Sequence, residues 1–106
     1  MDLSQEEWTS KLLENKDAII LDVRTQGECL EGIIPNALQI DIFEGQGFVY
    51  KVEELDKSKT FFVYCKLGGR SAQACNVMNQ LGFEHTYNLI GGFTNWQGEI
   101  YLPQPK

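Results

Sequence analysis

The sequence has neither an excess of basic residues nor a long run of apolar residues. It carries 9 Lys and Arg residues against 15 Asp and Glu residues, which gives a formal net charge of -6. Proteins that wrap nucleic acid present a basic face instead. No window approaches the roughly 20 apolar residues that a helix needs to cross a bilayer. We therefore expect neither a nucleic-acid-binding protein nor a membrane protein.

Paired cysteines are also missing. Three cysteines at irregular spacing do not make a disulfide framework. The first residues have no basic start and no apolar stretch, so we expect no secretory signal and a cytoplasmic location. No paired ligand spacing joins the potential zinc ligands Cys29, Cys65, Cys75 and His85, so we expect no metal. We interpret Cys29 and Cys75 as packed helix residues and His85 as a surface residue.

What is present is the composition of one folded domain. Hydrophobic residues make up 42% of the 106 residues, which is ordinary for a compact protein with a single core. There is no internal repeat, linker or low-complexity run. We expect one monomeric domain over residues 1–106, with a core over about 4–96 and a C-terminal tail over 97–106.

Two capping boxes mark helix starts. Ser4 followed by Glu7 predicts a helix through about Glu14, and Thr25 followed by Glu28 predicts a second, short helix. In the first helix the spacing places three side chains inward, namely Trp8, Leu12 and Leu13. The stretch 41–55 is broken by glycines and is interpreted as a loop with a short helix.

Apolar runs alternate with these helices. The strongest strand signal is Thr60–Tyr64, where every residue is β-branched or aromatic. Further strands are predicted at 17–23, 37–40 and 86–90, and a helix at 71–81. This alternation predicts an α/β fold with a central, mainly parallel sheet of about five short strands and helices on both faces. In such sheets, ligands bind beyond the carboxyl ends of the strands.

The residues that carry chemistry lie between the best strand and the best helix. They read Cys65-Lys66-Leu67-Gly68-Gly69-Arg70-Ser71. A glycine-containing loop ahead of a helix turns its amides inward and binds anions. Gly68 and Gly69 permit the close backbone approach that such a ring requires, and Ser71 is expected to cap the helix.

Cys65 is the expected nucleophile of this loop. The amides, the helix dipole and the charges of Arg70 and Lys66 all favour its thiolate, which is the reactive form. Arg70 can grip an oxyanion through paired hydrogen bonds, while Lys66 supplies positive charge at the rim. The alternative is that Cys65 is a small buried hydrophobic residue and the glycines only form a turn.

The chain resembles the rhodanese domain, the thiosulfate sulfurtransferase family, over residues 4–96. The similar segments are Asp22-Val23-Arg24, Gly32-Ile33-Ile34-Pro35-Asn36-Ala37, Cys65 through Ser71, Leu81-Gly82-Phe83, and Gly91-Gly92-Phe93 with Trp96. Ile33 and Asn36 stand where the family often has His and Gly. The resemblance implies that Cys65 is catalytic and carries sulfur as a persulfide.

The resemblance also implies roles for the neighbouring residues. The loop amides from Lys66 to Ser71 and the Arg70 side chain would bind a small anionic sulfur donor such as thiosulfate, with the acceptor open. Asp22 and Arg24 would support the loop as a buried ion pair, although a catalytic role is the alternative. No organic cofactor is implied.

Loop length separates sulfur chemistry from phosphate chemistry. Related cysteine phosphatases keep one more residue between the cysteine and the arginine, which makes a wider ring for a tetrahedral phosphate. The shorter loop here favours attack on a sulfur atom. Two alternatives remain: a partner-binding or sulfur-relay module, and a phosphatase or arsenate reductase.

Overall fold

The computed structural model describes residues 1–103, and its core is a sheet of five parallel strands in the order β1-β5-β4-β2-β3. The strands are β1 (Asp2–Leu3), β2 (Ala18–Asp22), β3 (Leu38–Gln39), β4 (Thr60–Tyr64) and β5 (His85–Leu89). The helices are α1 (Gln5–Glu14), α2 (Gln26–Cys29), α3 (Gln46–Glu53) and α4 (Gly69–Gln80), with 3₁₀ turns η1 (Ile42–Glu44) and η2 (Phe93–Asn95). The predicted fold class is confirmed.

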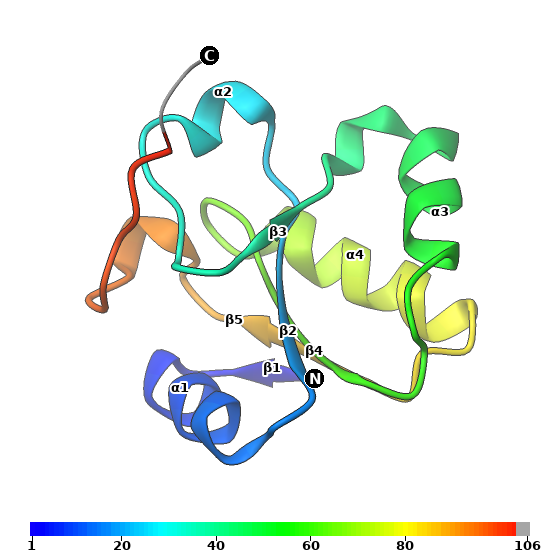
Figure 1. Cartoon of the computed structure of the whole chain (residues 1–106), viewed down its shortest axis with the longest axis horizontal. Coiled ribbons are helices and arrows are strands. Elements are labelled where there is room, and N and C mark those ends of the chain that lie inside the picture. The colour runs from blue at the N-terminus through cyan, green and yellow to red at the C-terminus, as the bar shows by residue number, and fades with distance from the viewer. Residues whose placement is uncertain (104–106) are drawn as a thin grey trace.

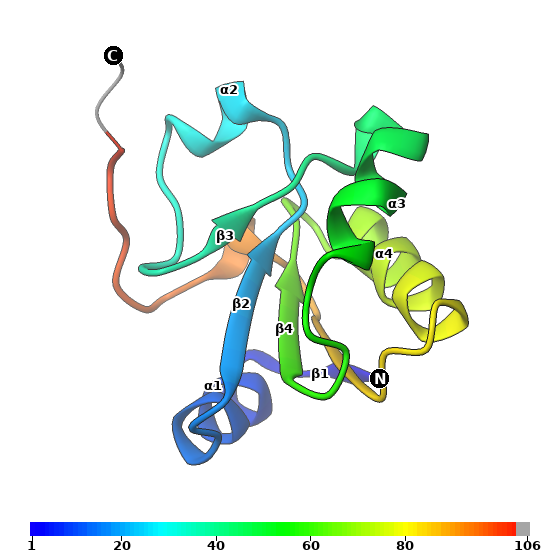
Figure 2. The same ribbon diagram turned by 45° about the vertical axis from the view of Figure 1, so that its right-hand side comes forward.

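Strand β4 lies in the middle of the sheet and is buried along its whole length. Its side chains alternate, so that Phe61 and Val63 contribute to one core while Phe62 and Tyr64 contribute to the other. The first core is closed by α3 and α4, and the second by α1 and η2. Figures 1 and 2 show α1 on one side of the sheet and α3 and α4 on the other.

Both predicted capping boxes are present. Ser4 Oγ accepts the Glu7 amide at 3.2 Å, and Thr25 Oγ1 accepts the Glu28 amide at 3.2 Å. Helix α1 buries Trp8 completely, but Leu13 is 82% exposed, so the expected inward position of Leu13 is wrong. The segment 41–55 forms η1 and α3, as predicted.

The chain termini take part in the fold more than the sequence indicated. Strand β1 pairs with β5 through Asp2 and Leu3, ahead of the predicted core. In the predicted tail, Tyr101 pairs with Ile33 in an antiparallel bridge, while residues 104–106 lie outside the described residues. Asn36 has a φ of 70°, a left-handed conformation that Asn and Gly tolerate best.

No helix within residues 1–103 is both long and apolar enough to cross a membrane.

Candidate active site

The segment Cys65–Ser71, called here the nucleophile loop, leaves the carboxyl end of β4 and enters α4. Gly68 is the N-cap of α4 and adopts a φ of 112°, a conformation that only glycine enters without strain. Cys65 is 1% exposed. The loop therefore lies at the edge of the sheet where the sequence predicted a site.

The sulfur of Cys65 is surrounded by hydrogen-bond donors. The Gly68 amide donates to Sγ at 3.0 Å, and the Ser71 hydroxyl lies 3.3 Å from it. Burial alone would raise the pKa of this thiol, but the Ser71 hydroxyl and the amides of Ser71, Gly68 and Leu67 lower it by more. The pKa of Cys65 therefore lies below that of an ordinary cysteine, and the loop favours the thiolate.

The pKa values of the other two cysteines are shifted in the opposite direction. Burial, with Asp22 nearby, raises the pKa of Cys29 to about 12, and burial raises the pKa of Cys75 to about 11. Both are at most 7% exposed, which confirms their expected packing. Cys65 is thus the one cysteine of the three whose surroundings activate it.

Ser71 does not cap α4, contrary to the sequence prediction. The helix begins at Gly69, two residues earlier than expected, and its N-cap Gly68 offers no side chain. Ser71 therefore lies within the first turn, where it is fully buried and its hydroxyl points back toward the loop. There it also lies 3.2 Å from the Gly68 carbonyl.

Asn88 of β5 is a site residue that the sequence analysis missed. It is 4% exposed and lies behind the nucleophile loop, where its Oδ1 accepts the Ser71 hydroxyl. Its Nδ2 donates to the Gly68 carbonyl at 3.2 Å. Asparagine is uncommon inside strands, and that oddity is the signal that could have singled it out.

Glu28 is the second residue that was missed, because it was assigned only to a capping box. Arg70 Nη1 and Nη2 donate to its two carboxylate oxygens, each at 2.8 Å. The Arg70 side chain is 22% exposed, and its guanidinium lies 5.3 Å from the ring centre of Phe43. The hydrogen bond from Arg70, although opposed by burial, lowers the pKa of Glu28 to about 2.

Asp22 and Arg24 form the ion pair that the sequence predicted. Arg24 Nη2 lies 2.7 Å from Asp22 Oδ2, with both side chains at most 3% exposed. The same nitrogen donates to the Gly32 carbonyl at 2.7 Å, and the guanidinium lies 4.3 Å from the ring centre of Phe93. This pair ties the end of β2 to the segments around the nucleophile loop.

The turn after β5 holds the start of the nucleophile loop. The amides of Phe93 and Thr94 donate to the carbonyls of Cys65 and Lys66 at 2.9 and 3.0 Å. Gly92 lies so close that a Cβ atom there would be 2.5 Å from the Lys66 carbonyl oxygen. The Leu67 side chain is 66% exposed, and Lys66 is exposed too.

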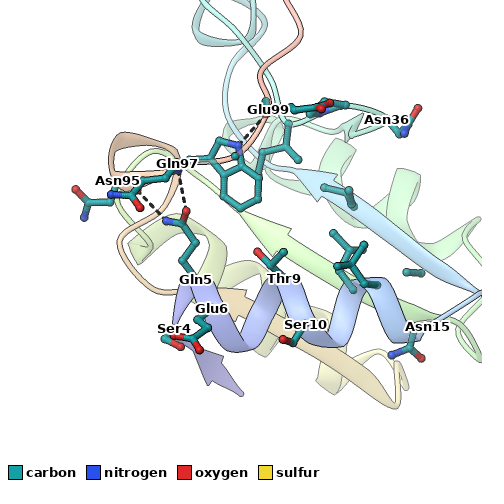
Figure 3. A pocket seen from close by; sticks show the side chains of 18 of the residues that line it. Ser4, Gln5, Glu6, Thr9, Ser10, Asn15, Asn36, Asn95, Gln97 and Glu99 are labelled. Carbon is teal, nitrogen blue, oxygen red and sulfur yellow. Dashed lines mark hydrogen bonds between the residues drawn. The ribbon is translucent and has the colours of Figure 1, made fainter.

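Two hollows differ in their relation to this loop. A pocket of about 310 Å³ borders it and is lined by Arg24, Glu28, Glu31, Lys66, Phe93 and Thr94. A larger groove of about 1270 Å³ lies between α1 and the segment 95–99, where Gln5 bridges Asn95 and Gln97 (Figure 3). No residue of the nucleophile loop lines the larger groove, whereas Lys66 of that loop lines the smaller pocket.

Comparison with known proteins decides the family. The model of the rhodanese-like domain matches residues 5–99. This chain belongs to the rhodanese-like domain family. Its relatives in that family include a protein named sulfurtransferase from Allochromatium vinosum, 32% identical over 90% of this chain and 86% of the relative. Thiosulfate sulfurtransferase GlpE of Coxiella burnetii is 36% identical over 82% of this chain and 78% of its own.

A solved structure supports the rhodanese-like architecture. The rhodanese-like domain protein from Staphylococcus aureus superposes with a TM-score of 0.82 at 29% identity. The match covers 97% of this chain and 98% of that one. The likeness therefore extends over nearly the whole length of both chains.

Proposed function

We propose that this rhodanese-like protein is a sulfurtransferase that carries sulfane sulfur as a persulfide on Cys65. The observation that carries the proposal is the buried Cys65 sulfur, which accepts the Gly68 amide and lies within reach of the Ser71 hydroxyl. A cysteine whose pKa is lowered in this way presents more of the nucleophilic thiolate than an ordinary cysteine does. The names of the relatives favour sulfur as the group transferred.

The proposed reaction has two displacement steps. The Cys65 thiolate attacks the outer sulfur of thiosulfate, the S–S bond breaks, and sulfite leaves with the bonding electron pair. Cys65 then carries a persulfide with a terminal negative charge. In the second step a nucleophilic acceptor attacks that terminal sulfur, and the Cys65 thiolate is the leaving group. Charge and electrons balance, and no oxidant or acid is required.

The nucleophile loop would bind the donor and stabilise the persulfide. The amides of residues 66–71 lie at the N-terminus of α4, where negative charge is favoured. The guanidinium of Arg70 would contact the sulfonate group, for which it must exchange its contacts with Glu28. Asp22 and Arg24 would keep the loop in place from the neighbouring strand.

The test is intact mass after incubation with thiosulfate. We expect the wild type to gain the mass of one sulfur atom and to lose it on addition of cyanide. Cys65→Ser should gain nothing and should have no thiosulfate:cyanide activity. Cys29→Ser and Cys75→Ser are the controls and should behave as the wild type. Sulfur carried by Cys65→Ser, or lost from either control, would identify a different nucleophile.

A further inference from the structure

Asn88 places an amide group between the first strand and the nucleophile loop. Its Nδ2 donates to Asp2 Oδ1 at 3.0 Å and to the Gly68 carbonyl at 3.2 Å. Its Oδ1 accepts from Ser71 Oγ on the other side. The side chain thus links β1, the loop and α4 through one residue of β5.

The surroundings of Asn88 define which end of its amide faces Ser71. The carboxylate of Asp2 and the carbonyl of Gly68 can only accept hydrogen bonds. The NH₂ end must therefore face them, which leaves the carbonyl end toward the Ser71 hydroxyl. A flipped amide would set its oxygen against two acceptors and lose both bonds.

Ser71 has a single hydroxyl proton and three acceptors within reach. These are Asn88 Oδ1, the Gly68 carbonyl at 3.2 Å and the Cys65 sulfur at 3.3 Å. Asn88 Oδ1 is the nearest of the three. A proton given to Asn88 is withdrawn from the sulfur, because a hydroxyl donates only once.

We propose that Asn88, oriented by Asp2, is a positioning residue that competes with Cys65 for the hydroxyl proton of Ser71 and so regulates the nucleophile. This inference rests on Cys65 being the reactive residue. With Cys65 as a thiol, Ser71 donates to Asn88 and can accept from the S–H group. With Cys65 as a thiolate, Ser71 turns to the sulfur, and Asn88 Oδ1 is left against an oxygen lone pair. Asn88 therefore favours the thiol.

Other charges around Cys65 stay constant in the variants that test this. Lys66 and Arg70 lie on the nucleophile loop, and Glu28 of α2 pairs with Arg70. Asp22 at the end of β2 pairs with Arg24. Asp2 acts through Asn88. Of these charged groups, a change at Asn88 alters the contacts of Asp2 only.

The test is the pH dependence of Cys65 alkylation by iodoacetamide, followed by peptide mass in the full chain. Ser71→Ala should raise the pH midpoint of alkylation, because the Cys65 thiolate loses the hydroxyl as a hydrogen-bond donor. Asn88→Leu, of similar size, should move it down by about one pH unit, which is a tenfold rise in the thiolate-to-thiol ratio. The double variant should match Ser71→Ala, since Asn88 acts through Ser71. Asp2→Ala, at an exposed position, should move the midpoint down by less.

Thr86→Val is the matched control. Thr86 is also a buried polar residue of β5, bonded to Asn79 of α4 at 2.8 Å, away from the loop. It should lower the melting temperature without moving the alkylation midpoint. An unchanged or raised midpoint in Asn88→Leu overturns the proposal, as does a double variant that differs from Ser71→Ala. If Asn88→Leu does not fold, a midpoint in Asp2→Ala that stays or rises overturns it equally.

The outcome is separable from that of the proposed function. Alkylation needs no sulfur donor, so the expected midpoints without any persulfide would leave Asn88 as the positioning residue and reject sulfur transfer. Persulfide formation on Cys65, with alkylation midpoints that do not change in the Asn88 and Asp2 variants, would support sulfur transfer and reject the role of Asn88.

Discussion

Glu28 holds Arg70 by both oxygens of its carboxylate, with two N–O distances of 2.8 Å. The arginine that the sequence assigned to anion binding is therefore already paired with an anion of the protein itself. Under the proposed function, a sulfur donor with a sulfonate group would have to compete with Glu28 for the guanidinium. Glu28 would then influence which donors the site accepts.

The first prediction concerns this competition. Arg70→Ala and Arg70→Lys should lower thiosulfate turnover about tenfold or more, because the paired charged hydrogen bonds are lost. Glu28→Gln should instead lower the KM for thiosulfate, since the guanidinium is released while Gln still completes the capping box. Steady-state kinetics on the three variants measures this. A Glu28→Gln variant as impaired as Arg70→Ala would show that Glu28 orients Arg70 for the substrate.

The second prediction is a pH dependence of stability. Arg70 lowers the pKa of Glu28 from 4.5 to about 2 in the folded state, so the folded protein binds fewer protons there than the unfolded chain. The contribution is complete above pH 4.5 and is lost as the pH falls toward 2. Urea unfolding between these values should show a smaller decline in Glu28→Gln than in the wild type. If the free energy of unfolding falls equally steeply with pH in both proteins, Glu28 does not have a lowered pKa in the folded state.

The third prediction concerns the buried pair of Asp22 and Arg24. Asp22→Ala should lower the free energy of unfolding by about 3–5 kcal/mol, because Arg24 is left charged and buried. Glu44→Ala breaks the exposed ion pair with Lys51, whose side chains are 40% and 57% exposed, and should cost about 1 kcal/mol or less. Urea denaturation compares them. Similar losses of unfolding free energy in Asp22→Ala and Glu44→Ala would mean that the buried pair stabilises the fold no more than an exposed one.

The fourth prediction separates backbone strain from steric contact at glycine. Gly92 and Gly45 have φ values of 59° and 60°, but a Cβ atom at Gly92 would overlap the carbonyls of Cys65 and Lys66, whereas one at Gly45 meets nothing within 4 Å. Gly45→Ala should cost about 1–3 kcal/mol and leave Cys65 alkylation unchanged. Gly92→Ala should cost more and slow the alkylation, because the nucleophile loop must shift. Normal alkylation in folded Gly92→Ala would contradict this.

The fifth prediction follows from the length of the nucleophile loop. Wild-type protein should show negligible hydrolysis of small aryl phosphates, because the four residues between Cys65 and Arg70 are expected to make a ring too narrow for a phosphate group. One residue inserted there should weaken sulfur transfer. A phosphate-release assay beside the thiosulfate:cyanide assay measures both. Efficient phosphate release by the wild type would overturn the argument from loop length.

Local signals in the sequence were sufficient for most of the fold. The β-branched and aromatic run Thr60–Tyr64 predicted β4 to the residue, and the two capping boxes marked the starts of α1 and α2. Strand β1 escaped prediction, because two residues carry no periodicity. Its pairing depends on β5, which lies at the other end of the chain.

The same limit applies to the site. Cys65, Gly68 and Arg70 lie in one loop, and their residue types carry their chemistry. The partners Glu28 and Asn88 come from other elements, and they reach the loop only when the chain has folded. Ser71 was found but misassigned, because α4 begins at Gly69, two residues earlier than the pattern indicated, with Gly68 as its N-cap.

The contact between Asp2 and Asn88 has a consequence for synthesis on the ribosome. The two residues are 86 positions apart, and Cys65 is translated between them. Until β5 has emerged, β4 lacks its neighbour on one edge, and Ser71 lacks the amide that engages its hydroxyl. Without that amide, the Ser71 hydroxyl has only the Cys65 sulfur and the Gly68 carbonyl as acceptors. The contact by which Asn88 restrains Cys65 therefore forms only after β5 has joined the sheet.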